Sequence, residues 1–444
     1  MKKQNGIINM IALLLVALVI IVVFFFYVFF LKDIISSSEV PVVDNTTEAS
    51  EVKNEVGENE VKPTPDKQKI ANTDFDYKFL KLEAEENKNL VYSPLSIKSA
   101  LKMLVEGASG ETKAELDALL DGVDLNHYQS VGEQLSFVNG IYIRNEFKDS
   151  MKEEYVDLLK TKYEAEVNYD DFKSPDVINK WIEDKTFGII KNLLRQDQID
   201  EAELLLINAL AIDMRFKAPF EDSNTRAREF EKADGSKVEV AMMNGLFHSE
   251  DVMYVDNKDE IAFVTKLEEL DDANLEFMAV MPKNESLNEY AANFDKDKLE
   301  AIDKELKDAS KEEGGVRVYI PRFAFDYSLK LKKDLKDLGV ELAFDEEFAD
   351  FSNMANEPLH VDDAIHKADF RFSEKGVKAA AVTVIVMQKN SAIIAEPAKP
   401  VELNFDKPFM FFIRDREKND IWFVGTMYEP DLWENVRTEY EAKY

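Results

Sequence analysis

The chain has 444 residues, of which 45% are hydrophobic, including 30 phenylalanines, so it can bury a large core. It contains no cysteine, which excludes disulfides, thiol catalysis and cysteine-ligated metals. A formal net charge of −33 disfavours binding to nucleic acid, indicates a soluble surface and favours basic partners at low salt.

The first predicted element is an apolar run from Ile7 to Leu31. Its 25 residues are enough to cross a bilayer core of about 30 Å. Two lysines precede the run, whereas Lys32 and Asp33 nearly cancel after it, so the positive-inside rule places the rest of the chain outside the cell. The run is too long for a cleaved signal peptide, and no Ala-x-Ala site follows it. We therefore predict a single-pass anchor in the cell membrane within residues 1–33.

Residues 34–70 are rich in Ser, Glu, Val and Asn and contain no aromatic residue. Such a composition cannot bury enough apolar surface to order itself, which predicts a flexible acidic stalk. We assign residues 71–432 to one large domain and residues 433–444 to a C-terminal tail. The anchor and the absence of cysteine favour a bacterial source with the domain outside the cell.

Helix and strand signals alternate irregularly along the domain. Ser93-Pro94 is an N-cap followed by apolar residues at helical spacing up to Gly107. The segment Glu203–Met214 is a predicted buried strand in which Asn208 is a conspicuous polar residue. Further helices are expected at about 112–120, 150–163, 286–292, 296–308 and 328–338, and after Ser174-Pro175. Further strands are expected at about 137–143, 164–169, 238–248, 262–268, 274–281, 316–327, 365–373, 401–413 and 420–427. Runs of strands with helices clustered elsewhere indicate an α+β fold.

The stretch from Ser373 to Pro400 has an unusual pattern. From Val377 on, one face of an extended chain carries only small or apolar residues, namely Val377, Ala379, Ala381, Thr383, Ile385 and Met387. A strand continuing to Asn390 would span about 45 Å at about 3.3 Å per residue, well beyond the usual strand of about 5–6 residues. Two interpretations remain open: a long hairpin arm or central strand, or a segment that is an exposed loop in one state and a strand in another.

Several motifs resemble those of the serpin family, in the same order and with similar spacing. They are Tyr92–Ser96, Asn179–Thr186, Asn208, Leu338–Ser352, His366–Gly376, Ala379–Ala381, Phe405–Ile413 and Phe423–Pro430. The resemblance covers about residues 70–432. It implies a serpin fold: a large, mostly antiparallel central sheet with helices and smaller sheets, and an exposed reactive-centre loop at about residues 374–400, here preceded by one transmembrane helix.

The resemblance also implies a function. Serpins are suicide inhibitors of serine proteases and sometimes cysteine proteases: the protease cleaves the loop, and the freed strand enters the central sheet while the protease stays attached as a covalent acyl complex. The inward face from Val377 carries no charge, proline or large ring, which is compatible with insertion. The expected partner is a target protease, the expected state is a monomer, and no cofactor is expected. The alternative is a non-inhibitory surface protein with a binding or chaperone-like role.

Three groups of site residues follow from the resemblance. The hinge consists of Glu374, Gly376, Val377, Ala379, Ala380 and Ala381, with Val377 where the family usually has Thr or Ser. The shutter, a polar cluster behind the opening of the sheet, consists of Ser93, Ser96, Asn208 and His366. The breach, at the top of the opening, has Phe216 where the family usually has tryptophan.

The cleaved bond is the least defined part of the site. Counting from the hinge gives Asn390–Ser391, whereas counting back from Phe405 gives Pro397–Ala398, because the loop is several residues longer than usual. We favour the hinge count, since the inserted length must match the sheet. Neighbouring candidates are Lys389 for a trypsin-like enzyme, and Ile394 and Ala395 for an elastase-like one.

Enzyme motifs are absent from the sequence. There is no Gly-x-Ser-x-Gly elbow, no phosphate-binding glycine loop, and no pair of the four histidines at a metal-binding spacing. We therefore expect neither an enzyme nor a metal site.

Overall fold

The computed structural model describes residues 74–83, 88–123, 125–126, 128–200, 202–361, 364–377 and 398–441. These residues belong to one unit of the chain, Thr64–Tyr444. The predicted membrane anchor and stalk lie outside the described residues, as does most of the predicted loop. Among the helices of the described part, none is long and apolar enough to cross a membrane.

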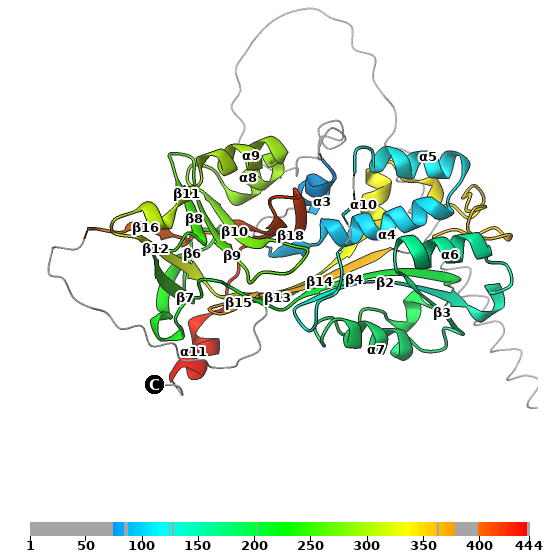
Figure 1. Ribbon diagram of the computed structural model, residues 1–444, viewed down its shortest axis with the longest axis horizontal. Coiled ribbons are helices and arrows are strands. Elements are labelled where there is room, and N and C mark those ends of the chain that lie inside the picture. The colour runs from blue at the N-terminus through cyan, green and yellow to red at the C-terminus, as the bar shows by residue number, and fades with distance from the viewer. Residues whose placement is uncertain are drawn as a thin grey trace, which may run out of the picture. The chain divides into compact units, whose positions relative to one another are not determined.

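The largest sheet has seven strands in the order β1-β18-β17-β10-β9-β8-β11, each antiparallel to its neighbours (Figure 1). Every residue of β10, β17 and β18 is buried, which is why these segments are almost continuously apolar in the sequence. The strands are β1 (Leu90–Tyr92), β8 (Val252–Asp256), β9 (Glu260–Lys266), β10 (Leu275–Pro282), β11 (Lys307–Asp308), β17 (Phe409–Asp415) and β18 (Asp420–Met427).

A second sheet has four strands in the order β16-β12-β7-β6. Strand β12 is antiparallel to β7 and parallel to β16, so the chain reaches β16 through a long connection rather than a hairpin. Its members are β6 (Arg226–Glu231), β7 (Lys237–Phe247), β12 (Val316–Pro321) and β16 (Val401–Asn404).

The remaining strands form the sheets β3-β2-β4 and β13-β14-β15-β5. Strand β5 follows β4 after the single residue Asp213, so the two sheets meet at this point of the chain. The members are β2 (Leu135–Arg144), β3 (Glu166–Asp170), β4 (Leu204–Ile212), β5 (Met214–Arg215), β13 (Phe323–Lys330), β14 (Ile365–Ser373) and β15 (Gly376–Val377).

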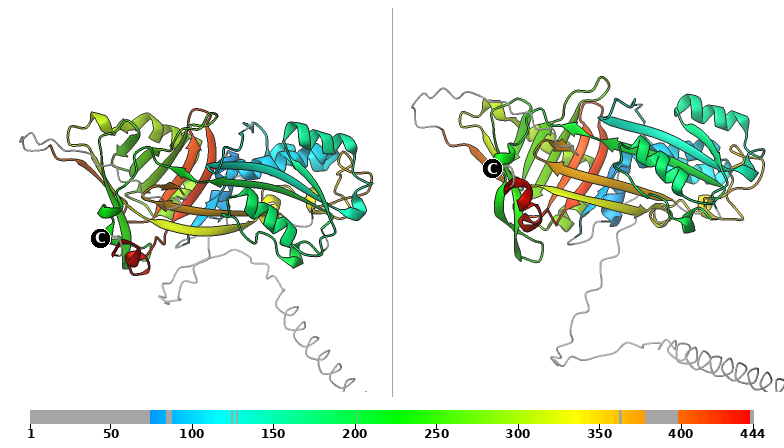
Figure 2. Two further views of the ribbon diagram at one scale, coloured as in Figure 1. Left: turned by 60° about the horizontal axis from the view of Figure 1, so that its bottom comes forward. Right: turned by 90° about the horizontal axis from the view of Figure 1, so that it is seen from below.

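Helices cover the sheets. Helix α4 contacts β4 and β18. Helix α7, drawn in green in Figure 2, lies over β2 and β4, and its Ile178 and Ile182 belong to one buried cluster with Tyr142 and Ile207. The α-helices of the described residues are α3 (Phe75–Glu83), α4 (Pro94–Gly107), α5 (Gly110–Leu119), α6 (Glu153–Lys162), α7 (Asp176–Lys185), α8 (Leu287–Asn293), α9 (Lys296–Glu305), α10 (Leu331–Asp337) and α11 (Trp433–Glu441).

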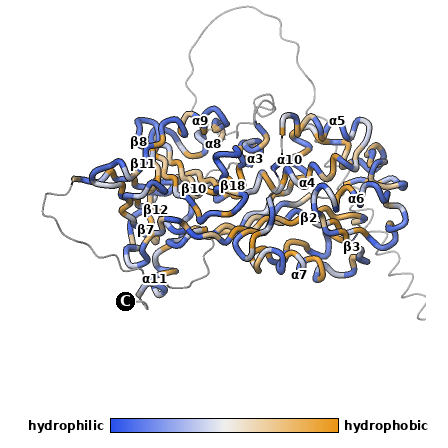
Figure 3. The backbone as a smooth tube through the Cα atoms, in the orientation of Figure 1, coloured by the Kyte–Doolittle hydropathy of each residue, from blue (hydrophilic) through white to orange (hydrophobic). Residues whose placement is uncertain are grey.

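The core is rich in aromatic rings, as the phenylalanine content suggests. The ring of Phe372 on β14 stacks on that of Phe277 on β10 with centroids 4.2 Å apart, and Phe370 lies 4.6 Å from Phe411 on β17. Hydrophobic stretches follow the strands through the molecule in Figure 3. These contacts fasten β14 to the seven-stranded sheet.

The expected α+β class is confirmed, and of four local differences the first three have clear causes. The expected strand at 401–413 is two strands, because Pro408 has no backbone N–H for a ladder. The expected strand at 316–327 divides at Arg322, whose N–H and C=O bond to Ala241 and Asp431 outside the ladder. Residues 323–330 pair with β14, so helix α10 begins only at Leu331. Residues 433–441, assigned to the tail, form α11.

Candidate functional site

The described part of the hinge consists of the turn after β14 and the short strand β15 of the β13-β14-β15-β5 sheet. Strand β14 ends at Ser373, Glu374 and Lys375 form a turn, and β15 returns antiparallel to β14 with Val377 opposite Phe372. On its other side β15 is antiparallel to β5, with Val377 opposite Met214. Strands β14 and β5 therefore run parallel to each other, and Val377 is buried between them with 3% of its surface exposed.

Only glycine fits at position 376. Its φ angle is +152°, and a Cβ atom there would lie 2.1 Å from the carbonyl oxygen of Met214. A side chain would push β15 away from β5. The hinge glycine identified in the sequence therefore permits the close pairing of β15 with both neighbours.

The turn is held by its backbone and by a buried carboxylate. The N–H of Phe216 donates to Lys375 O and the N–H of Phe220 donates to Glu374 O, both at 2.9 Å. The Glu374 side chain is 5% exposed, and its Oε1 accepts a hydrogen bond of 2.6 Å from the hydroxyl of Thr225. Lys375 forms an ion pair with Asp222 at 3.1 Å.

Phe216, expected at the breach, lies directly beside this turn. It is 3% exposed, and its ring packs edge-on against those of Phe372 and Phe220, with centroids 5.5 Å and 6.4 Å away. A phenylalanine thus fills the position where the resemblance predicts an aromatic plug.

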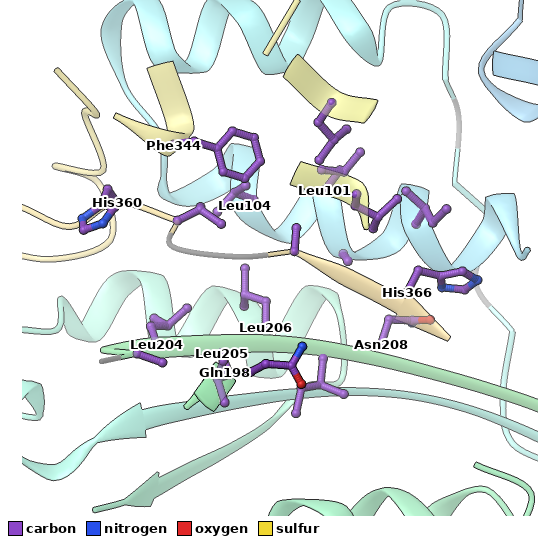
Figure 4. A pocket seen from close by; sticks show the side chains of 18 of the residues that line it. Leu101, Leu104, Gln198, Leu204, Leu205, Leu206, Asn208, Phe344, His360 and His366 are labelled. Carbon is purple, nitrogen blue, oxygen red and sulfur yellow. The ribbon is translucent and has the colours of Figure 1, made fainter. Parts of the chain in front are cut away.

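The four shutter residues are brought together from three elements. Ser93 caps α4: its Oγ accepts from the N–H of Ser96 at 3.1 Å, while its own N–H donates to Nε2 of His366 on β14 at 2.9 Å. Ser96 Oγ in turn donates to Asn208 Oδ1 on β4. His366 on β14 and Asn208 on β4 both lie beside α4 (Figure 4).

Burial lowers the pKa of His366 to about 4, so its imidazole is neutral at pH 7. Since Nε2 accepts from Ser93, the ring proton belongs on Nδ1. Uncharged donors and acceptors thus link α4 to both β14 and β4. Such hydrogen bonds can change partners if these two strands move apart.

The network extends to residues that the sequence analysis did not single out. Asn139 on β2 accepts from Asn208 Nδ2 at 2.8 Å and from Ser99 Oγ at 3.0 Å, and donates to Tyr163 O at 2.7 Å. The available signal was an asparagine within a predicted apolar strand, the same signal that identified Asn208.

A cavity of about 170 Å³ adjoins the shutter, between β4, the segment leading into β14 and helix α4. In the described residues β4 and β14 are not paired with each other. Figure 4 shows leucines of α4 and β4 around this space, with Asn208 and His366 at one end and His360 at the other. Its apolar lining includes Leu101, Leu104, Leu204, Leu206, Phe344 and Leu359.

The other predicted site residues cannot be placed. Ala379, Ala380, Ala381, Lys389, Asn390, Ser391, Ile394 and Ala395 all lie outside the described residues. In the part of the chain that the structure describes, no group of His, Asp and Glu side chains is arranged to hold a metal ion.

Comparison with known proteins decides the family. The family model "Serpin (serine protease inhibitor)" matches residues 70–430. The chain belongs to the serpin family.

Its relatives include proteins of archaea and animals. An uncharacterized serpin-like protein of Methanosarcina acetivorans is 29% identical over 376 residues, covering 80% of this chain and 85% of the relative. Human neuroserpin is 27% identical over 395 residues, covering 80% of this chain and 90% of the relative.

Solved serpin structures match this serpin as well. The thermophilic serpin tengpin in its native state superposes with a TM-score of 0.67 at 26% identity, covering 85% of this chain and 97% of tengpin. Native protease nexin-1 with heparin gives a TM-score of 0.66 at 24% identity, covering 82% of this chain and 100% of nexin. The expected serpin fold is thereby confirmed, and family membership supports protease inhibition in general.

Proposed function

We propose that this serpin is a suicide inhibitor of serine proteases that traps its target by inserting the cleaved loop beside β14. The observation that carries the proposal is the position of β15. Its two residues already lie between two parallel strands and run antiparallel to both. A chain that continued in this direction would form two antiparallel ladders at once, the more stable kind of pairing.

The register of β15 specifies where an inserted chain would lie. Carried forward from Val377, it places Ala379 between Phe370 and Ile212, and Thr383 between His366 and Asn208. All four neighbours lie on the face of their strands that points to the core or the shutter. The hydroxyl of Thr383 would offer both a donor and an acceptor to His366 and Asn208 on either side of it.

Farther along, the same register places apolar side chains at the cavity. Ile385 would meet Leu206, and Met387 would meet Leu204, the first residue of β4. Burying an isoleucine and a methionine contributes about 1.5–3 kcal/mol each. A strand that ended at Asn390 would cover all of β4 and extend beyond Leu204, so cleavage at Asn390–Ser391 leaves enough chain for full insertion.

The proposed reaction starts as ordinary proteolysis. The protease serine attacks the carbonyl carbon of Asn390, the peptide C–N bond breaks, and the new amine of Ser391 leaves with a proton from the protease histidine. The ester between Asn390 and the protease serine then remains while the freed strand inserts. Insertion supplies the free energy that displaces the protease before water hydrolyses the ester.

A panel of serine proteases tests this proposal. We expect an SDS-stable complex with at least one member, together with a C-terminal fragment whose mass identifies the cleaved bond. Cleavage of the loop by a protease that is not trapped should raise the melting temperature strongly. No complex with any member and an unchanged melting temperature after cleavage would instead favour a non-inhibitory binding or chaperone-like role.

We also propose that the segment Ile7–Leu31 anchors this serpin in the cell membrane with the inhibitory domain outside. The apolar length of the segment and the lysines before it support this orientation. Membrane fractionation of cells expressing the full chain should recover it with the membranes, and external protease should release the domain from intact cells. Recovery in the soluble fraction would contradict the proposal.

A further inference from the structure

Helix α11 follows the last strand of the large sheet and packs on β7 (Figure 1). Its apolar residues Trp433, Val436 and Tyr440 share one face, and Val436 and Tyr440 are buried together with Ala241 of β7. The rings of Trp433 and Tyr440 stack with centroids 5.6 Å apart. The end of the described chain is thus fixed to the body of the domain.

The segment before α11 is attached on two sides. Asp431 O accepts from Ala241 N and Asp431 N donates to Arg322 O, both at 3.0 Å, while Arg322 N donates to Ala241 O at 2.9 Å. The Arg322 guanidinium also forms ion pairs with Asp431 at 3.2 Å and with Glu439 of α11 at 2.6 Å. Arg322 lies immediately before β13, so α11 is fixed relative to the strand next to β14.

From this position α11 reaches the hinge. The hydroxyl of Tyr440 donates to Glu374 Oε1 at 2.6 Å, the oxygen that also accepts from Thr225, and itself accepts from Arg322 Nη1 at 3.2 Å. Burial, followed by the charge of Glu374, raises the pKa of Tyr440, so the hydroxyl stays neutral and keeps its proton for this bond.

The contacts hold the turn where insertion must begin. If the turn moved, the buried carboxylate of Glu374 would lose both hydroxyl donors, which is unfavourable in a site that is 5% exposed. The same turn determines the register of β15, because its carbonyls accept from Phe216 and Phe220. A restrained Glu374 therefore directs the chain after Gly376 into the space between β14 and β5.

We propose that Tyr440 of α11 is a positioning residue that holds the loop hinge through Glu374 and sets the register in which the loop enters the sheet. The effect on loop insertion rests on the proposed inhibitory function. The contact between Tyr440 and Glu374 can be tested without any protease. Tyr440 neither contacts a protease nor takes part in the acyl transfer; it acts through Glu374.

The first test measures amide exchange in the intact, full-length protein. Tyr440→Phe removes one hydrogen bond to a carboxylate and should speed deuterium exchange of the Phe216 and Phe220 amides about tenfold. The matched control is Tyr290→Phe, which removes a buried tyrosine–carboxylate bond of 2.9 Å to Glu260 on the large sheet and should leave these amides unchanged. Equal exchange in Tyr440→Phe and wild type, or a uniform increase along the chain, would overturn the inference.

A second variant tests whether the faster exchange comes from Glu374 or from a local change in α11. Thr225→Val removes the other hydroxyl that donates to Glu374 Oε1 and should speed the same amides while α11 stays intact. Because both hydroxyls bind one oxygen, the double variant should deviate from the sum of the single effects. Strict additivity would argue against a shared restraint on Glu374.

The functional readout is the partition between trapped and cleaved inhibitor. Tyr440→Phe should increase the cleaved, untrapped fraction several-fold and leave the association rate constant unchanged, because loop recognition is not altered. An unchanged partition in a variant with faster hinge exchange would refute the role in insertion. If wild type traps no protease, the proposed function fails, whereas the exchange experiment still decides whether Tyr440 holds the hinge.

Discussion

A single charge on the inward face of the loop should abolish inhibition by this serpin. In the register of β15, residue 379 would lie between Phe370 and Ile212, which are 2% and 4% exposed. An aspartate introduced by Ala379→Asp would have to enter this apolar layer, away from water.

The size of the effect follows from the protonation equilibrium. The inserted aspartate would be neutral, and protonating a carboxyl of ordinary pKa about 3.9 at pH 7 costs about 4 kcal/mol at about 1.4 kcal/mol per pH unit. Leaving its polar atoms without hydrogen bonds adds about 1–3 kcal/mol. This total cost exceeds the free energy gained by burying one large apolar side chain. Insertion should therefore become slower than hydrolysis of the ester, and the protease should be released.

The pH dependence has a definite sign. Burial raises the pKa of residue 379 in the inserted state, so the penalty is absent below pH 4 and grows as the pH rises. At pH 5 the protonation part is only about 1.5 kcal/mol. Trapping by Ala379→Asp should therefore recover partly when the pH is lowered from 7.5 to 5, measured with a protease that is active over this range.

The assay compares complex and cleaved inhibitor on denaturing gels, and the melting temperature before and after cleavage. The matched control is Val382→Asp, whose side chain would point to the opposite face, directly across from Lys367 of β14 in the register of β15. The control should trap protease as wild type does. If Ala379→Asp trapped protease as efficiently as Val382→Asp at pH 7.5, the proposed register and the insertion mechanism would both be wrong.

Three further predictions concern the hinge, the shutter and the cavity. Gly376→Ala should lower the free energy of unfolding of the intact protein in urea by at least about 2 kcal/mol, because its Cβ would lie 2.1 Å from Met214 O at a positive φ; unchanged stability would mean that β15 is not paired as described. The pKa of about 4 at His366 lies below its unfolded value of about 6.5, so the unfolded state binds the extra proton and His366 by itself should lower the stability of wild type by about 3 kcal/mol as pH falls from 6.5 to 4. His366→Gln, which keeps an acceptor for Ser93, should flatten that dependence in urea titrations, and a variant with the wild-type slope would exclude His366 as its source. Ile385→Ala should leave the intact protein unchanged and destabilise the cleaved form by about 2–4 kcal/mol; calorimetry of both forms checks this, and an equal loss in both would show that Ile385 is buried before cleavage.

The sequence predicted those local features of the structure that depend only on neighbouring residues. Ser93-Pro94 predicted the start of α4, because an N-cap depends on residues within one turn. The glycine of the hinge and the apolar alternation after it marked the segment that begins to enter the sheet. The asparagine in a buried strand marked a polar contact, although not its partners.

What only the tertiary structure decided are contacts between residues far apart in the chain. Ser93 meets His366 across 273 positions, and Tyr440 meets Glu374 across 66. Nothing in the local pattern of residues 433–441 indicates that their helix ends on the hinge. The reason is physical: helix caps and strand alternation arise from interactions between sequence neighbours, whereas the partner of a buried polar group depends on how whole layers pack. For this serpin the sequence alone therefore determined the family resemblance and predicted an inward face of the loop, whereas the packing of α11 and β13 decided what holds the hinge in place.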